Sequence, residues 1–377
     1  MLGLSIGDKS KYRQKQYARP KYPGRFNKLA FKDTFSKLDM NKWRPEITAG
    51  GGGNWEFQFY NNDRRTSFVE DNVLYIKPML TMDYLGMDVE KFLKEGGLNL
   101  WGNTPGMQCT ANGFYGCERS TQGDNIVNPI MSAQLRTVNS FNFRYGRVEI
   151  EAKLPRGDWI WPAIWLMPKH HAYGGWPASG EIDIVEARGN SDNCHGDGIS
   201  TVASTLHWGT HWSKSMYELT TGKAKSGGAD FSRKFTKFTL EWTEEHIRTL
   251  ADGKVILDVR FDEPFFKRGN YSKTEFNPWA NSEKSRKNAR LTKSSTSSSM
   301  SPLVASTASF PIPQGTADVP PRSPGRTLTK ALPRTSSTPE TNGSRHGPTQ
   351  MTLTLQHWQS RASKSTLNEN LIIYQSR

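Results

Sequence analysis

Short segments of alternating apolar and polar residues, separated by turn dipeptides, dominate the middle of this 377-residue chain. Residues 145–154 and 237–242 alternate cleanly, as expected for strands with one buried face. Asp71-Asn72 and Asp252-Gly253 each lie between two such segments, which is typical of β-hairpins. No long apolar stripe with a period of 3.6 residues accompanies them. The pattern predicts an all-β fold, a sandwich of antiparallel sheets.

The net charge of +14 is confined to the two ends of the chain. Residues 1–26 carry seven Lys or Arg against one acid, and residues 281–377 carry 13 against four. Residues 27–280 hold 30 basic and 31 acidic side chains, a net charge of −1. Blocks of like charge usually repel and stay unfolded, so a polyanion-binding arm is the weaker interpretation of the two ends. We expect no nucleic-acid partner.

The composition changes abruptly after Trp279. Of the 97 residues from 281 to 377, 40 are Ser, Thr or Pro, and sustained alternation returns only at residues 371–374. Such a segment buries too little apolar area to offset the entropy of ordering it. We therefore predict a basic, disordered arm over residues 1–26, one β domain over residues 27–280 and a disordered tail over residues 281–377.

Three further features limit the class of protein. No run of 18 or more apolar residues occurs, so we expect no membrane partner. The first eight residues hold too short an apolar stretch for a secretory signal peptide. Three cysteines are too few for a disulfide-dense scaffold.

Glu181, Asp183 and Glu186 form the most informative constellation in the chain. On a strand, Glu181 and Asp183 share one face because they are two residues apart. Glu186 has the wrong parity for that face, but a β-bulge near Ile184-Val185 would return it there. Three like charges on one face repel, so nothing structural favours this arrangement. A functional role is therefore the preferred interpretation over an outward-pointing Glu186 or an Arg-paired Glu181.

Two chemistries suit such a trio. In retaining glycoside hydrolysis, one carboxylate attacks the anomeric carbon and a second carboxyl protonates the leaving oxygen. Mutual repulsion would keep a proton on one member near neutral pH. Carboxylate clusters also hold hard cations, but no Asp-x-Asp-x-Asp-Gly loop and no adjacent His pair is present. We expect no cofactor and no catalytic metal; a structural Ca²⁺ could be accommodated, but no motif indicates one.

Aromatic residues crowd the segment that precedes the trio, among them Trp161, Trp165 and Trp176. Sugar rings present apolar C–H faces that stack on aromatic rings, so this row suits a polysaccharide cleft. Core packing is the alternative for each tryptophan, and above all for Trp165. His207 could donate a hydrogen bond to a sugar hydroxyl or to a carboxylate, and a structural role is equally compatible with its position.

The segment Glu-Ile-Asp-Ile-Val-Glu over residues 181–186 resembles the Glu-x-Asp-x-x-Glu signature of glycoside hydrolase family 16. The chain is similar to the invertebrate β-1,3-glucanase and β-1,3-glucan-binding-protein branch from about Phe26 to Trp279. The supporting stretches are residues 48–58, 98–101, 117–119, 128–130, 132–137, 153–159, 161–165 and 176–181. The resemblance implies a concanavalin A-like β-jelly roll of two antiparallel sheets, with a glucan cleft on its concave face.

The same resemblance implies a role for each site residue. Glu181 would be the nucleophile, Glu186 the general acid and base, and Asp183 the residue that assists between them. The residues that would contact sugar are Trp161, Trp165, Trp176, His207, Asn54 and Arg136.

The partner implied by the resemblance is β-1,3-glucan, bound by an extracellular monomer. In a secreted relative, Cys109 and Cys117 would form a disulfide and leave Cys194 over.

The branch contains enzymes and non-catalytic recognition proteins of innate immunity. All three acids are present here, and 26 residues are too few for an extra N-terminal glucan-binding module, so we expect a retaining endo-β-1,3-glucanase.

The family continues after residues 277–279 with an aromatic strand and ends on an apolar closing strand, and the tail shows neither pattern. We therefore expect the sandwich to lack its closing strands, through a shifted reading frame. An inactive product of a damaged gene is the remaining interpretation.

Overall fold

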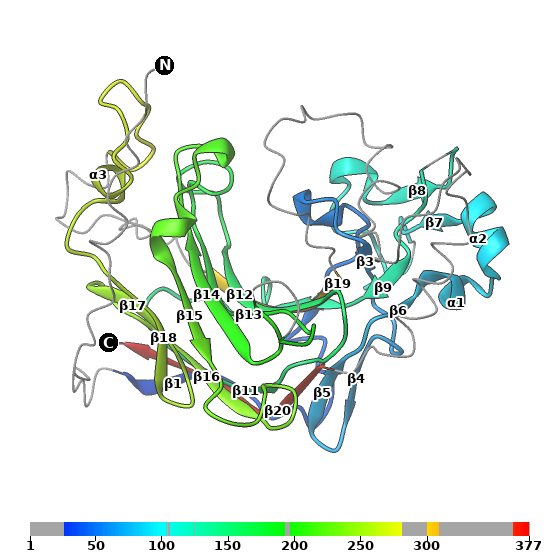
Figure 1. The fold of residues 1–377 in the computed structure, drawn as a ribbon, viewed down its shortest axis with the longest axis horizontal. Helices are drawn as coiled ribbons and strands as arrows, with labels where there is room; N and C mark the ends of the chain where they lie inside the picture. The colour runs from blue at the N-terminus through cyan, green and yellow to red at the C-terminus, as the bar shows by residue number, and fades with distance from the viewer. Residues whose placement is uncertain are drawn as a thin grey trace, which may run out of the picture.

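The structure is a computed structural model in which two large antiparallel sheets lie one above the other (Figure 1). Among the described residues, no helix is long and apolar enough to span a membrane. The described residues are 26–102, 104, 106–123, 125–192, 197–280, 300–308 and 365–376.

The larger sheet has eight strands in the order β18-β17-β16-β11-β20-β5-β4, with β1 also paired to β20. Both predicted hairpins are confirmed within it, because Asp71 and Asn72 join β4 to β5 and Asp252 and Gly253 join β17 to β18. All four turn residues have positive φ, as the tight hairpin turn requires. The bounds are β1 Phe26–Asp33, β4 Ser67–Glu70, β5 Val73–Ile76, β11 Gly146–Lys153, β16 Thr236–Trp242, β17 His246–Ala251, β18 Lys254–Arg260 and β20 Ser365–Ser376.

The second sheet has seven strands in the order β15-β14-β13-β12-β19-β10-β2. Along β12, fully buried residues alternate with half-buried ones, so the strand turns one face to the core and carries its tryptophans on the other. The bounds are β2 Arg44–Pro45, β10 Gln134–Arg136, β12 Ile160–Pro168, β13 Glu181–Ala187, β14 Thr201–His207, β15 Thr221–Lys225 and β19 Met300–Ala308.

Smaller elements flank the two sheets. In the three-stranded sheet β3-β9-β6, β3 runs parallel to β9, and β7 pairs with β8 in a separate ribbon. The strands are β3 Gln58–Tyr60, β6 Met79–Leu80, β7 Gly97–Asn99, β8 Glu118–Ser120 and β9 Ile130–Ser132. The α-helices are α1 Thr81–Leu85, α2 Val89–Glu95 and α3 Phe265–Arg268; the 3₁₀ turns are η2 Gly51–Gly53, η3 Gly113–Tyr115, η4 Trp212–Lys214 and η5 Tyr217–Thr220.

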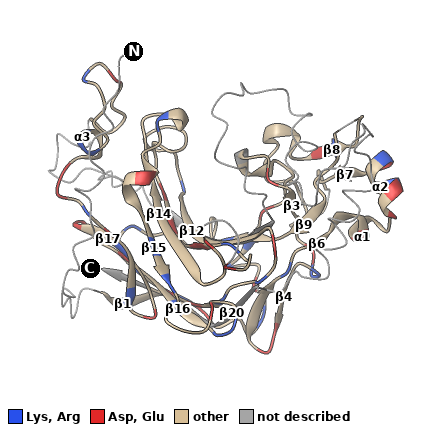
Figure 2. Ribbon diagram, in the orientation of Figure 1, with Lys and Arg blue, Asp and Glu red and all other residues tan. Residues whose placement is uncertain are grey.

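Apolar side chains from both large sheets pack between them as one core. Ile164, Ile182 and Leu206 enter it from the seven-stranded sheet, and Val148 and Leu240 enter it from the eight-stranded sheet. Each fully buried aliphatic side chain stabilises the fold by about 1.5–3 kcal/mol. Positions of basic and acidic residues are interspersed along the described part of the ribbon (Figure 2), as expected for a nearly neutral middle region. The predicted β-jelly-roll sandwich is confirmed.

The expectation that the tail lacks closing strands is wrong at two segments. β19 lies between β12 and β10, and β20 lies between β11 and β5. Ladder hydrogen bonds use main-chain groups, which a Ser- and Thr-rich segment supplies as well as any other. Leu371 and Ile373 alternate along β20 and are both buried in the core. The predicted disorder of residues 1–25, 281–299 and 309–364 lies outside the described residues.

Candidate active site

The three carboxylates lie together on β13 because the strand is bulged. Glu181 pairs with His207 of β14, Asp183 with Thr205 and Glu186 with Ala203. Two residues of β13 therefore stand opposite the single residue Ser204, which is the count of a β-bulge. The bulged pair, Ile184 and Val185, is fully buried. The predicted bulge is confirmed, and it returns Glu186 to the face that carries the other two acids.

Each glutamate accepts a hydrogen bond from a tryptophan indole. Trp176 Nε1 donates to Glu181 Oε2 at 2.5 Å, and Trp161 Nε1 donates to Glu186 Oε1 at 2.9 Å. Trp161 reaches its partner from the neighbouring strand β12, on the face opposite the core. The indole N–H is a donor only, so it orients each carboxylate and leaves its second oxygen available.

The third acid is deeply buried between the two glutamates. Asp183 is 2% exposed, and its Oδ2 lies 3.1 Å from His207 Nε2. The main-chain oxygen of Asp183 accepts a hydrogen bond from Ser204 Oγ at 2.6 Å, which ties β13 to β14 at the bulge. The carboxyls of Glu181 and Asp183 share a side-chain hydrogen bond. Asp183 therefore links one glutamate to the histidine.

Burial and mutual repulsion raise the proton affinity of the whole trio. Burial first, and then the neighbouring Asp183 charge, raises the pKa of Glu181 to about 8. Burial also raises the pKa of Glu186 to about 7, although His207 acts in the opposite direction. The pKa of Asp183 is likewise raised, by burial and then by Glu186. Near neutral pH the site thus holds exchangeable protons beside carboxylate oxygens, which acid–base chemistry requires.

Aromatic rings continue the site beyond Glu181. The His207 ring lies 5.7 Å from the Trp176 ring and 5.3 Å from the Tyr217 ring, centroid to centroid. Trp176 is 41% exposed, so its ring borders solvent as well as the carboxylates. Trp165 stands opposite Asp183 in the β12–β13 register, and within the described structure its buried Nε1 has no hydrogen-bond partner. A buried indole N–H without an acceptor is a ready donor to a ligand oxygen.

A further acid, Glu56, lies two residues before β3. Glu56 accepts hydrogen bonds from the amides of Asn54, at 3.4 Å, and Gln58. The pKa of Glu56 is raised by its burial, and its charge in turn raises the pKa of Glu186. Glu56 is thus a fourth acid, and it acts electrostatically on Glu186.

Arg136, which was predicted to contact sugar, forms an ion pair with Glu46. Its guanidinium lies 2.8 Å from Glu46 Oε2, and the second oxygen of Glu46 accepts from Thr110 Oγ1. The Arg136 side chain is one quarter exposed, and its guanidinium is engaged in this ion pair. A contact with sugar remains a prediction.

Comparisons with known proteins identify the family of this chain. The sequence profile described as glycosyl hydrolases family 16 matches residues 111–296. A β-1,3-glucan-binding protein of Penaeus monodon is 44% identical over 258 residues, which are 67% of this chain and 68% of that protein. The chain belongs to glycoside hydrolase family 16.

One further sequence relative and one solved structure are also similar to this chain. A glucan endo-1,3-beta-glucosidase A1 of Niallia circulans is 29% identical over 269 residues, 63% of this chain but only 32% of that enzyme. The solved catalytic domain of an endo-1,3-beta-glucanase (laminarinase) from Thermotoga petrophila covers 93% of this chain and 98% of its own, with a TM-score of 0.53 and 19% identity. At that identity, the likeness shows the fold alone.

Two residues of this family 16 site were missed by the sequence analysis. Glu56 lies in a stretch that supported the resemblance, but nothing in the linear pattern connects it with an acid 130 residues later. Tyr217 lies in η5, the connection from β14 to β15, where no alternation marks a facing side chain. Only the fold brings Tyr217 to His207 and lets the charge of Glu56 act on Glu186.

The predicted disulfide between two of the three cysteines is confirmed. Cys109 and Cys117 form a disulfide that closes the loop carrying η3, with Cα atoms 5.6 Å apart. Cys194 lies outside the described residues.

A metal ion could also use part of the site. Donor atoms of Glu181, Asp183 and His207 lie within 4.8 Å of one another, a set of two carboxylates and one imidazole. Such a set suits a divalent transition metal more than Ca²⁺, which prefers oxygen ligands only.

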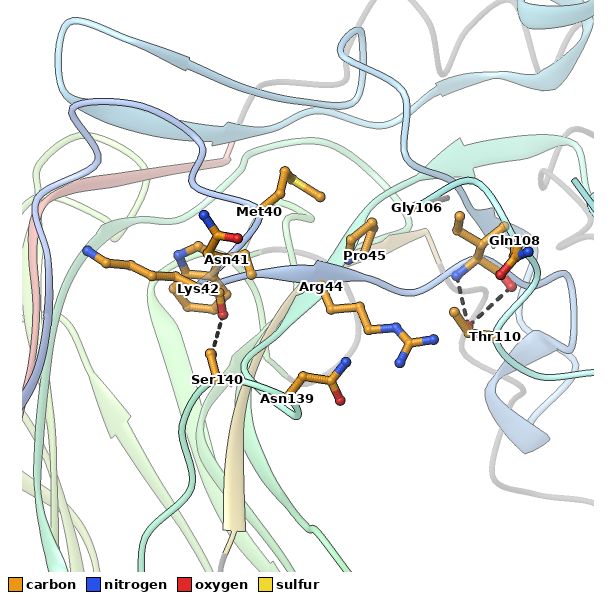
Figure 3. Close-up of a pocket in the computed structure, with 12 residues that line it drawn as sticks. Met40, Asn41, Lys42, Arg44, Pro45, Gly106, Gln108, Thr110, Asn139 and Ser140 are labelled. Carbon is orange, nitrogen blue, oxygen red and sulfur yellow. Dashed lines mark hydrogen bonds between the residues drawn. The ribbon is translucent and has the colours of Figure 1, made fainter. Parts of the chain in front are cut away.

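A separate pocket of about 250 Å³ lies beside the edge strand β2 and contains none of the three acids (Figure 3). Its polar lining includes Asn41, Arg44, Gln108 and Asn139. It is bounded by Ser140, whose hydroxyl donates to the main-chain oxygen of Lys42 at 2.5 Å.

Proposed function

We propose that this family 16 chain is a retaining endo-hydrolase of β-1,3-glucosidic bonds in laminarin-like glucans. The observation that carries the proposal is the bulge of β13, which sets two indole-bound glutamates and a buried aspartate on one face. That arrangement supplies a nucleophile, an acid and a proton-sharing group within one short segment. The names of the Niallia and Penaeus relatives support β-1,3-glucan as the substrate class.

The proposed hydrolysis proceeds in two displacements that use the carboxyl and indole contacts described above. The proton shared between Glu181 and Asp183 moves to Asp183, and Glu181 is left ionised. Its oxygen attacks the anomeric carbon while Glu186 donates its proton to the departing glycosidic oxygen. Glu186, now a carboxylate, removes a proton from the water that releases the sugar from Glu181. Trp161 and Trp176 hold the two carboxylates in place throughout.

The decisive experiment is incubation of the full chain with laminarin. We expect reducing ends to appear, and the first product seen by proton NMR to have the β configuration, because two displacements retain it. An initial α-configured product would contradict the mechanism.

A binding-only role is the second candidate, because the Penaeus relative is named a glucan-binding protein. Laminarin bound at the site without any release of reducing ends would select it.

The acid Glu56 offers a test of the electrostatics. Glu56→Gln is expected to lower the pKa of Glu186, because a like charge beside it is removed. Since Glu186 must be protonated to act as the acid, the high-pH limb of kcat/KM should move to lower pH. The shift should be less than roughly one pH unit, because Glu56 has the weakest of the effects on the pKa of Glu186. Glu95→Gln on the exposed end of α2 is the matched control. A limb that stays in place or moves upward would contradict this account.

We also propose that hydrolysis needs no metal or other cofactor, because Glu181 and Glu186 supply both catalytic groups. Laminarin hydrolysis should be unchanged after treatment with EDTA, and its loss with recovery on adding back a divalent cation would overturn this proposal.

We further propose an extracellular, monomeric protein with no nucleic-acid or membrane partner. The Cys109–Cys117 disulfide supports an oxidising compartment.

A further inference from the structure

The pocket beside β2 is lined by positive charge and by no acid. Among the described residues, its charged lining consists of Lys42 and Arg44 (Figure 3). The Lys42 ammonium is already engaged, because it donates to the main-chain oxygen of Lys32 at 2.9 Å and lies 3.5 Å from Asp33 Oδ1. The exposed Arg44 guanidinium has neither a hydrogen bond nor an ion pair with any described residue. Arg44 is therefore the charge that this pocket offers to a ligand.

A second arginine makes the position of Arg44 unfavourable without an anion. Arg44 of β2 stands directly opposite Arg136 of β10, so the two side chains share one face of the sheet. Like charges at directly opposite positions repel. Glu46 lies between them in charge balance, but it is bound to Arg136 at 2.8 Å. The pKa of Arg136 is lowered, first by burial, and the charge of Arg44 acts in the same direction. The two arginines thus leave one positive charge that Glu46 does not balance.

The remaining polar lining of the pocket is neutral. Asn41, Gln108 and Asn139 contribute side-chain amides, and none of these amides is hydrogen-bonded within the part of the chain that the structure describes. Figure 3 shows Arg44 extending between Asn139 and Thr110, while the ammonium of Lys42 points away. Amides both donate and accept hydrogen bonds, so they complement hydroxyl groups beside a charged group.

Hydrogen bonds to the main chain hold the walls of the pocket. Ser140 Oγ donates to the main-chain oxygen of Lys42 at 2.5 Å. On the other side, the N–H of Ile47 donates to Thr110 Oγ1 at 3.0 Å, and the N–H of Thr110 donates to the oxygen of Ile47 at 2.9 Å. The segment that carries Arg44 is therefore tied at both ends to the segments that face it. A pocket formed in advance loses little conformational entropy when a ligand binds.

The pocket is separate from the carboxylate trio but lies in register with it. Directly opposite residues on five adjacent strands run in the order Arg44, Arg136, Leu303, Trp165 and Asp183. Four strand spacings therefore separate Arg44 from Asp183, which is about 19 Å along the sheet. A small ligand in the pocket leaves the carboxylates accessible.

We propose that this pocket binds a sugar that carries an oxyanion group, either a carboxylate or a sulfate ester, and that Arg44 recognises the charge. A guanidinium presents parallel N–H donors that match two oxygens of either group. The pocket volume of about 250 Å³ is several times the roughly 30 Å³ that one water occupies, so a sugar ring fits beside the charged group. The proposal goes beyond the proposed function, which concerns an uncharged glucan at the trio.

The test measures the affinity of the full chain for glucuronate, glucose 6-sulfate and glucose by ligand-observed NMR at low salt. We expect at least one of the two acidic sugars to bind about ten-fold more tightly than glucose, as a charge-assisted hydrogen bond provides. The acidic sugar that binds more tightly identifies the oxyanion group. Arg44→Gln should reduce the preference to within about two-fold. Its melting temperature should not fall, because repulsion from Arg136 is removed.

Arg260→Gln is the matched control for Arg44→Gln. It removes the same charge from an exposed strand residue of the eight-stranded sheet, so the preference for the acidic sugar should stay as in the parent. Glu181→Gln should keep the preference too, because the trio lies apart from the pocket. A preference that disappears in Glu181→Gln would place the acidic sugar at the carboxylates and overturn the proposal.

Three further results would contradict the pocket. Equal affinity of the parent for all three sugars, or an undiminished preference in Arg44→Gln, would remove the role of Arg44. Inorganic sulfate that binds as tightly as glucose 6-sulfate would show a simple anion site and overturn the assignment of a sugar. A failure of laminarin hydrolysis, by contrast, overturns the proposed function and leaves these binding results as they are.

Discussion

Replacing Glu186 with Gln is expected to lower kcat on laminarin by about 10²–10⁴-fold, because the departing glycosidic oxygen then has no proton donor. Glu181→Gln should cost at least as much, since the covalent intermediate cannot form. The indole hydrogen bonds from Trp161 and Trp176 can both be kept by the amide oxygens, so the local geometry is preserved. Reducing-end release at pH 6 measures the loss.

Stability provides the control for these two variants. The pKa of Glu181 is raised from 4.5 to about 8 on folding, so the folded protein holds this proton more tightly than the unfolded chain. The associated stability is fully present below pH 4.5 and is lost as the pH rises through 8. Glu181→Gln stays neutral, so its free energy of unfolding should decline less across that range. Laminarin binding should persist in both variants. Parent-like hydrolysis by Glu181→Gln would refute its role as the nucleophile.

Truncating the buried side chains of β20 is expected to destabilise the fold strongly. Leu371 and Ile373 are 1% and 0% exposed and pack in the core between the two large sheets. Replacing either with Ala removes buried apolar atoms and leaves a cavity, at a cost of about 2–5 kcal/mol each. The measurement is urea unfolding followed by tryptophan fluorescence. Near-additive losses in the double variant would leave little or no folded protein.

Leu29→Ala is the matched control for this prediction. Leu29 lies on β1, opposite Tyr374 of β20, and is 53% exposed, so its loss should change the free energy of unfolding by no more than about 0.5 kcal/mol. Equal and small effects at Leu29, Leu371 and Ile373 would show that β20 does not close the eight-stranded sheet.

Much of the carboxylate site could be predicted from local pattern. Parity along one strand placed Glu181 and Asp183 on one face, and the mismatch at Glu186 indicated a bulge, because side-chain direction in a strand depends only on position along it. Trp161 and Trp176 were predicted to contact sugar because aromatic residues crowd the segment before the trio, but their hydrogen bonds to the two glutamates were not predicted. The contact of Tyr217 with His207 and the effect of Glu56 on Glu186 were not predictable, because each depends on the path of a loop or a separate sheet that no periodicity encodes.

The amino-acid sequence by itself determined the strand content, the hairpin turns, the carboxylate motif and membership in a fold class, because these depend on local periodicity and residue type. Only the tertiary structure decided that β19 and β20 close the sheets, that Arg136 is engaged by Glu46, and that Trp55 meets Phe114. These depend on contacts between segments distant in sequence, where main-chain pairing and burial outweigh composition. A tail judged too polar to fold can still supply a strand, since a sheet bonds backbone to backbone, and in β20 Leu371 and Ile373 join the core.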